Sequence, residues 1–131
     1  MRFIPTKFHA PLDYIVGVVL IAAPWIFQFS DHTAGTVVTV VLGVGLIAYS
    51  LVTDYELGVW KIAPMAFHNL IDIVAGIVLV ASPWLFGFAD EGAVAWLPMV
   101  VIGAAAIFLG LTTKQAGGYS YRRSETATAA H

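Results

Sequence analysis

The sequence of 131 residues contains no cysteine, and only 11% of its residues are charged. Without cysteine the chain has no disulfide bond, no thiolate metal site and no cysteine nucleophile. Its net charge of −2 provides no basic surface, so we expect no nucleic-acid partner. A serine nucleophile elbow and an HExxH zinc motif are also absent from the sequence. These absences favour a non-enzymatic protein without a resident cofactor.

Hydrophobic residues are abundant instead and make up 60% of the sequence. Soluble domains hold about 45–50% apolar residues and about 25% charged ones. Four segments are nearly free of charge, and each is close to the length of about 20 residues with which a helix spans the hydrocarbon of a bilayer. They are residues 10–29, 36–53, 68–88 and 94–112. We therefore predict an all-α bundle of four transmembrane helices surrounded by the lipid bilayer.

The six lysine and arginine residues mark one side of this predicted bundle. They lie before the first helix, in the middle loop and after the fourth helix, whereas the other two loops have none. They are Arg2, Lys7, Lys61, Lys114, Arg122 and Arg123. Cytoplasmic loops are enriched in these residues, so we predict a multi-pass protein of the cytoplasmic membrane with both termini in the cytoplasm. Residues 114–131 are predicted to form a flexible cytoplasmic tail.

The sequence contains an internal duplication. Residues 5–31 and residues 64–90 are identical at 13 of 27 aligned positions. Each repeat contains two predicted spans, so both copies insert in the same direction and are related by a pseudo-twofold axis along the membrane normal. We predict one membrane domain, residues 1–113, made of two tandem helical hairpins. The first repeat is residues 1–54 and the second is residues 60–113.

The identical residues recur at steps of three or four, which places them on one face of each first helix. Lipid-facing positions need only be apolar, so this face is predicted to pack against protein, either the other repeat or the second helix of its own repeat. Four glycines are predicted to allow close helix packing: Gly17, Gly76, Gly103 and Gly110. The small-residue faces also suggest a homo-oligomer or docking to a larger membrane partner.

A proline and aromatic motif closes both first helices of the predicted hairpins. Its residues are Pro24, Trp25 and Phe27 in the first repeat and Pro83, Trp84 and Phe86 in the second. Proline removes a helical hydrogen bond, so each helix is predicted to kink or end there. The aromatic residues, with Phe29 and Phe88, are predicted to form a belt at the lipid headgroups. A vestibule that binds a ligand or lipid is the alternative interpretation.

The segment Ala81-Ser82-Pro83-Trp84-Leu85-Phe86-Gly87-Phe88, preceded by His68, Asp72 and Gly76, resembles the SPW-repeat family of small prokaryotic membrane proteins. The first copy has Ala23 where the serine of the motif belongs, so a chemistry that uses this serine twice is excluded. The resemblance covers both halves of the chain and implies a four-helix membrane protein built from repeats. It implies no established activity.

Two His-x-x-x-Asp pairs, His9 with Asp13 and His68 with Asp72, contain the only acids inside the predicted spans. Ionisable residues in a membrane are functional candidates, because an unpaired carboxylate in hydrocarbon is costly. If the pairs converge across the pseudo-twofold axis, they suit a divalent metal such as zinc, or a proton-accepting cluster. The structural alternative places both aspartates in first helical turns, with Asn69 to Asp72 as a capping box.

Three functional hypotheses follow from these features. The first is a non-enzymatic integral membrane protein that acts as a structural or accessory module through helix packing. The second is a small ion or metal binding or transport protein that uses the paired His-x-x-x-Asp motifs. The third is a membrane enzyme of lipid or quinone chemistry, with the same four residues as acid and base.

Overall fold

The computed structural model describes residues 2–115, which form four long helices. They are α1 (Thr6–Ile26), α2 (Thr33–Val52), α3 (Met65–Leu85) and α4 (Ala93–Thr112), and a short 3-10 helix, η1 (Ala89–Glu91), precedes α4. The described part of the chain contains no β-sheet, so the predicted all-α fold is confirmed. The predicted tail lies, from residue 116 onward, outside the described residues.

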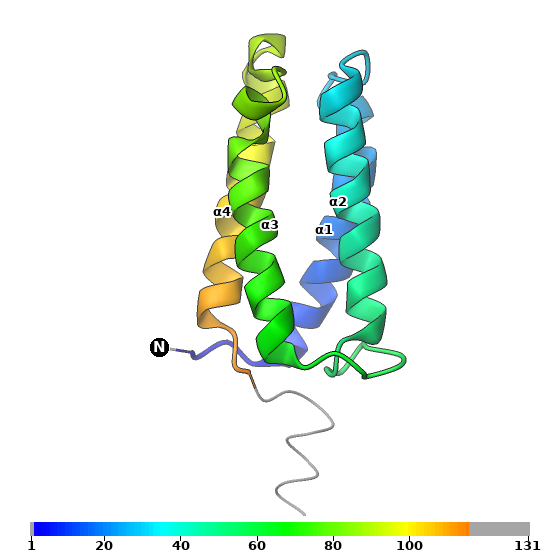
Figure 1. Ribbon diagram of the computed structural model, residues 1–131, viewed down its shortest axis with the longest axis vertical. Coiled ribbons are helices and arrows are strands. Elements are labelled where there is room, and N and C mark those ends of the chain that lie inside the picture. Colours follow the sequence, from blue (N-terminus) through cyan, green and yellow to red (C-terminus); the bar gives the residue numbers. More distant parts are fainter. Residues whose placement is uncertain (1, 116–131) are drawn as a thin grey trace, which may run out of the picture.

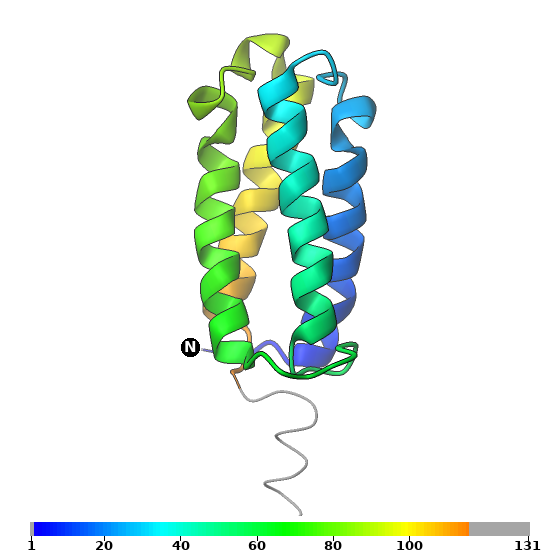
Figure 2. The ribbon, with the colours of Figure 1, turned by 45° about the vertical axis from the view of Figure 1, so that its right-hand side comes forward.

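The four helices form two hairpins that stand side by side. Figure 1 shows α1 beside α2 and α3 beside α4, and Figure 2 shows all four helices running along the same axis. Packing is dense within each hairpin and sparse between the hairpins. The α1–α2 and α3–α4 loops lie at one end, here called the loop end (Figure 1). The N-terminus and residues 53–64 lie at the other, here called the terminal end.

All four helices are long and apolar enough to cross a membrane. Their outward faces carry large apolar side chains such as Ile15, Val41, Val74 and Val101, each more than half exposed. A soluble protein would bury such a surface, whereas lipid solvates it. The outward faces therefore match a bilayer environment.

A proline sets the start of each first helix. Pro5 and Pro64 precede α1 and α3 with φ of −65° and −68° and with extended ψ, and neither helix has a side-chain cap. The proline ring fixes φ and supplies no N–H, so the chain turns into the helix directly after it. Both helices begin before the predicted residues 10 and 68. They also end earlier than predicted, at Ile26 and Leu85.

The terminal end is closed by two equivalent backbone pairings. Ile4 bridges Thr113 at the end of α4, and Ala63 bridges Thr53 at the end of α2. In the first pairing Lys114 N–H donates to the Ile4 carbonyl at 2.9 Å, and in the second Asp54 N–H donates to the Ala63 carbonyl at 2.8 Å. The segment before each first helix is therefore joined to the end of a second helix. These pairings hold Thr53 and Thr113 in equivalent places.

Glycines allow the two helices of each hairpin to touch. A Cβ atom on Gly43 would lie 2.6 Å from the carbonyl oxygen of Gly17, and one on Gly103 would lie 2.7 Å from that of Gly76. A Cβ on Gly110 would lie 2.6 Å from the Asn69 carbonyl oxygen. The glycines of the repeated face thus pack against the second helix of their own hairpin. The same face turns its polar residues toward the other hairpin.

The apolar core lies toward the loop end. Phe29 and Phe88 are buried there and stack with ring centroids 5.2 Å apart. These two rings do not face outward as the exposed tryptophans do, because the chain reverses after each helix and turns them inward. Trp25 and Trp84 are exposed, whereas Phe27 and Phe86 pack half-buried against the core. Pro24 and Pro83 lie buried in the last turns of their helices.

Candidate functional site

His9 and Asp13 lie on α1, and His68 and Asp72 occupy the equivalent positions on α3. Because the helices begin at Thr6 and Met65, both aspartates fall in the second turn, and neither helix has an acid in its first turn. The capping hypothesis is therefore wrong. The helices begin three or four residues earlier than the sequence suggests, at Thr6 and Met65. The aspartates therefore contact the imidazoles and not the free N–H groups of a helix start.

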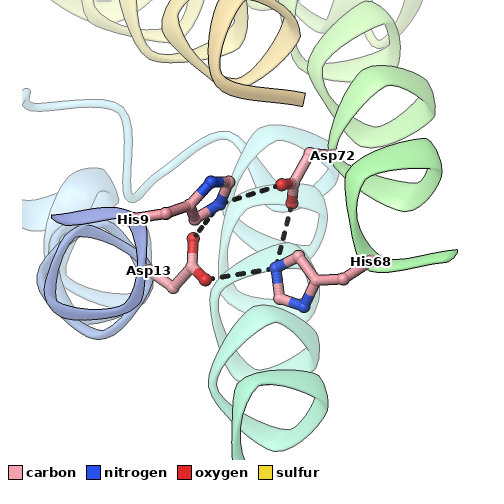
Figure 3. A group of neighbouring side chains, drawn as sticks. All are labelled: His9, Asp13, His68 and Asp72. Carbon is pink, nitrogen blue, oxygen red and sulfur yellow. Dashed lines mark ion pairs between the residues drawn. The ribbon is translucent and has the colours of Figure 1, made fainter. Parts of the chain in front are cut away.

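The four side chains meet between the two hairpins near the terminal end. Figure 3 shows them as a closed ring in which imidazoles and carboxylates alternate. The Nε2 atom of His9 lies 3.0 Å from Asp13 Oδ1 and 3.0 Å from Asp72 Oδ2. The Nε2 atom of His68 lies 3.1 Å from Asp13 Oδ2 and 3.4 Å from Asp72 Oδ1. Each carboxylate thus faces both imidazoles, and each imidazole faces both carboxylates. We call these four residues the His–Asp ring.

The His–Asp ring is sealed from solvent. His9 and His68 are fully buried, and Asp13 and Asp72 are 4% and 6% exposed. Two bare carboxylates in this position would leave two negative charges without water, which is costly. Either one divalent cation or one additional proton on each imidazole brings the charge of the ring to zero. Protons on the two carboxylates, beside neutral imidazoles, would have the same effect, so the geometry is compatible with a metal-bound ring and with a protonated one.

The other nitrogen of each imidazole is held by a threonine. His68 Nδ1 lies 2.6 Å from Thr53 Oγ1, and His9 Nδ1 lies 2.7 Å from Thr113 Oγ1. Thr53 has one hydroxyl hydrogen, which it donates to the Tyr49 carbonyl oxygen at 2.8 Å. Its oxygen therefore accepts a hydrogen bond from His68 Nδ1–H. With Nδ1 protonated, Nε2 of the neutral imidazole has a free lone pair directed at the centre of the ring.

Hydrogen bonds alone do not satisfy the centre of the ring. Nε2 of His9, Nε2 of His68 and Oδ2 of Asp72 are buried, and none of them makes a well-aligned hydrogen bond. A single N–H that is shared between two oxygens makes two bent and weaker hydrogen bonds instead of one straight one. A metal ion has no such restriction, because it accepts one lone pair from each surrounding atom. The ring therefore has the features of a metal site.

Tyr55 makes the ring asymmetric. Its fully buried hydroxyl donates to Asp13 Oδ2 at 2.9 Å, and Asp72 has no corresponding donor. Burial, together with the charge of Asp13, raises the pKa of Tyr55, so that the hydroxyl remains a donor at neutral pH. The Tyr55 carbonyl accepts a hydrogen bond from the ammonium group of Lys61. The loop between the repeats thus anchors one carboxylate.

A further set of contacts supports the ring from α4. Asn69 Nδ2 donates to the Thr113 carbonyl at 3.2 Å. The Arg2 guanidinium donates to the same carbonyl and to that of Gly110, both at 2.8 Å. These bonds satisfy carbonyls that the end of α4 leaves open. They also fix Thr113, and through it the orientation of His9.

The sequence contained signals for some of these residues. Thr53 and Thr113 match between the repeats, so their duplication pointed to a shared role. Tyr55 corresponds to Gln115 and gave no repeat signal. His32 accepts a hydrogen bond from the Gly35 N–H and caps α2. The remaining motif residues, from Pro24 to Phe27 and from Pro83 to Phe86, lie at the opposite end of the bundle and do not touch the ring.

Comparison with known families covers nearly all of the described chain. The sequence profile of the SPW repeat domain matches residues 7–113. The chain belongs to the SPW repeat family. The match includes all four helices and all four residues of the His–Asp ring, so this SPW repeat protein is a multi-pass membrane protein. No curated protein and no solved structure matches it.

Proposed function

We propose that this SPW repeat protein is a non-enzymatic membrane protein that holds one divalent metal ion, with zinc as the first candidate, in the His–Asp ring. The observation that carries the proposal is the pair of Nε2 atoms, buried and without aligned hydrogen bonds, between two carboxylates. Nitrogen and carboxylate oxygen are donors that zinc accepts.

The spacing of the ring supports a tetrahedral ion. Zinc binds imidazole nitrogen and carboxylate oxygen at about 2.0–2.2 Å, so the ligand atoms of a tetrahedral site lie about 3.3–3.6 Å apart. The four sides of the ring measure 3.0–3.4 Å and use both oxygens of each carboxylate. One ligand atom from each residue can be chosen so that all lie within 4.8 Å of one another. Binding of one ion would therefore need the side chains to move so that one oxygen of each carboxylate turns toward the centre.

The partners of the imidazoles also support the proposal. Histidines that bind metals usually donate the hydrogen of their second nitrogen to an oxygen atom, which fixes the orientation and the tautomer of the imidazole. Thr53 accepts such a bond from His68, and Thr113 Oγ1 lies in the equivalent place, 2.7 Å from His9 Nδ1. Each proposed histidine ligand thus has a threonine hydroxyl that holds its orientation.

An ion in the ring would connect one repeat to the other. Each helix pair is already held by glycine contacts, while the two hairpins have few contacts with each other. Metal bonds to α1 and α3 would add to the backbone pairings that join the two hairpins at the terminal end. The proposed role is therefore a structural one, in which the ion sets the arrangement of the two repeats for packing, oligomerisation or docking of a membrane partner.

We also propose the cytoplasmic membrane as the location, with the terminal end on the cytoplasmic side. Arg2, Lys7, Lys61 and Lys114 all lie at that end. The loop end carries acids and no lysine or arginine within the described residues. The positive-inside rule supports this orientation. The ring would then lie about two helical turns inside the cytoplasmic surface.

The test is metal content and ligand geometry of the purified protein. The chain is purified in detergent, stripped with a chelator, exposed to zinc and desalted, and its zinc is then counted by mass spectrometry. We expect one zinc ion per chain, with X-ray absorption showing two nitrogen and two oxygen neighbours at about 2.0–2.2 Å. Asp72→Asn and His68→Gln should lose the ion, whereas the exposed loop variant Asp90→Asn should keep it.

A folded wild-type protein that retains no zinc, cobalt or manganese would refute the proposal. The ring would then be neutralised by protons. Thermal unfolding followed by circular dichroism checks that each variant is folded before its metal content is compared. A variant that unfolds is replaced by Asp72→Glu, which keeps the carboxylate but moves it and should weaken binding without removing a charge.

A further inference from the structure

A cavity of about 340 Å³ lies between the two hairpins next to the His–Asp ring. All four helices line it, with residues such as Leu20, Leu46, Ala75 and Ala106. Its volume is at the lower end of the range of small-molecule sites, about 300–1,000 Å³. The sparse packing between the hairpins is the cause of this space.

The cavity opens sideways to the bilayer. Val41 lines it and is also 61% exposed on the outward face of α2. Gly45, one turn further along α2, lines the same opening, and a Cβ atom added there would meet no other atom within 4 Å. A molecule dissolved in the membrane therefore reaches the cavity without crossing water.

The cavity has one polar end. Among the described residues that line it, Tyr49 and Asp72 carry the only polar side chains. The hydroxyl of Tyr49 is buried and makes no hydrogen bond. Oδ2 of Asp72 faces His9 Nε2 at 3.0 Å, and a carboxylate oxygen accepts more than one hydrogen bond. A buried polar atom without a partner is costly, so the Tyr49 hydroxyl calls for a ligand group, with the Asp72 carboxylate on the same cavity wall as a further acceptor.

The pseudo-symmetry shows that Tyr49 is not required for the repeat fold. The residue equivalent to Tyr49 in the second repeat is Leu109, which packs into the same fold without a hydroxyl. Of these two equivalent positions, only the one on α2 therefore has a polar side chain. The combination of tyrosine, aspartate and an apolar cavity occurs in one copy.

We propose that this cavity binds one neutral membrane lipid with a free hydroxyl group and an apolar chain, such as a long-chain alcohol. The lipid hydroxyl accepts a hydrogen bond from Tyr49 and donates one to Asp72 Oδ2, and the chain follows the apolar lining from the ring toward the loop end. Oδ2 can accept this bond in addition to its contact with His9, and Oδ1 still faces His68, so this binding is compatible with either a metal ion or protons in the ring.

Recognition depends on the hydroxyl group, because an apolar chain gains little on leaving lipid for an apolar cavity. The test uses a long-chain alcohol with a diazirine in its chain, added to the protein in lipid nanodiscs and activated by light. We expect the label on residues that line the cavity. Unlabelled hexadecanol should displace the probe, and its methyl ether, which cannot donate, should be at least about tenfold weaker.

Two variants with a matched control locate the site. Tyr49→Phe keeps the aromatic side chain that contacts His68, but hexadecanol should displace the probe from it about tenfold or more weakly. Gly45→Phe fills the opening and should abolish labelling, whereas Val44→Phe, which adds the same ring to the neighbouring lipid-facing position, should leave it unchanged. Equal labelling of Gly45→Phe and Val44→Phe, or equal displacement by the ether, would refute the proposal. All three variants should retain zinc, so failure here is separate from failure of the metal proposal.

Discussion

The hydroxyl of Thr53 is the group whose removal tests the logic of the ring most directly. Thr53 is fully buried, accepts a hydrogen bond from His68 Nδ1 and donates one to the Tyr49 carbonyl. Thr53→Val keeps the shape of the side chain and removes the hydroxyl. The imidazole then has no partner that fixes which nitrogen carries the hydrogen.

The expected loss of zinc affinity follows from that missing bond. Leaving a buried N–H without an acceptor costs about 1–3 kcal/mol, and each 1.4 kcal/mol is about a factor of ten in affinity. Loss of a group that orients a metal ligand typically weakens binding by about 10–100-fold. We therefore expect Thr53→Val to bind zinc about 10–100-fold more weakly, and Thr53→Ser to restore most of the affinity.

Zinc affinity is measured by competition with a chelating dye, with the protein in micelles. Thr39→Val is the matched control, since Thr39 is also fully buried on α2 and donates to the Gly35 carbonyl at 3.1 Å, but does not touch the ring. Its zinc affinity should equal that of the wild type. If Thr53→Val and Thr39→Val bind zinc equally well, Thr53 does not orient His68 and the argument for a free Nε2 lone pair fails.

Three further predictions concern stability, measured as the free energy of unfolding in mixed micelles. Tyr55→Phe should lower it by about 1.5–3 kcal/mol, because a buried carboxylate loses its donor, whereas Tyr14→Phe, which loses an exposed bond, should change it by less than about 0.5 kcal/mol. Gly103→Ala should destabilise by about 1–3 kcal/mol, since its methyl group would lie 2.7 Å from a carbonyl of α3, while Gly45→Ala, in open space, should be neutral or stabilising; equal effects would refute the close-contact argument. Gln28→Gly should stabilise by about 0.5–1 kcal/mol, because Gln28 has a left-handed φ of 61°, and no gain would show that this conformation carries no strain.

The sequence was sufficient for the architecture because two strong signals agree. Hydropathy predicts four spans, and the duplication predicts two hairpins with equivalent faces. Placing His9, Asp13, His68 and Asp72 on those faces needed only helical periodicity. That periodicity could not decide whether the two faces meet, because the distance between hairpins depends on how their side chains pack.

Three residues lie where their local sequence does not predict them, and each has a physical reason. Asn69 through Asp72 matches a capping box, yet Pro64 starts the helix earlier and moves the pattern into its interior. The proline and aromatic motif predicts one belt for Trp25, Phe27 and Phe29, whereas the reversal of the chain after the helix turns Phe29 into the core. Tyr55 was missed because its contact with Asp13 crosses 42 residues and has no local signature.

The duplication explains how a symmetric centre comes to have an asymmetric environment. In a twofold dimer of identical hairpins, every residue near the axis occurs twice, so a donor to one carboxylate is a donor to both. With both hairpins in one chain, Tyr55 donates to Asp13 alone, while Asp72 keeps its contacts with the two imidazoles. Tyr49 lines the cavity beside Asp72, and the second repeat has Leu109 at the equivalent position. The two tyrosines therefore serve different carboxylates. Tyr55 donates a hydrogen bond to Asp13, and Tyr49 places a hydroxyl in the cavity beside Asp72.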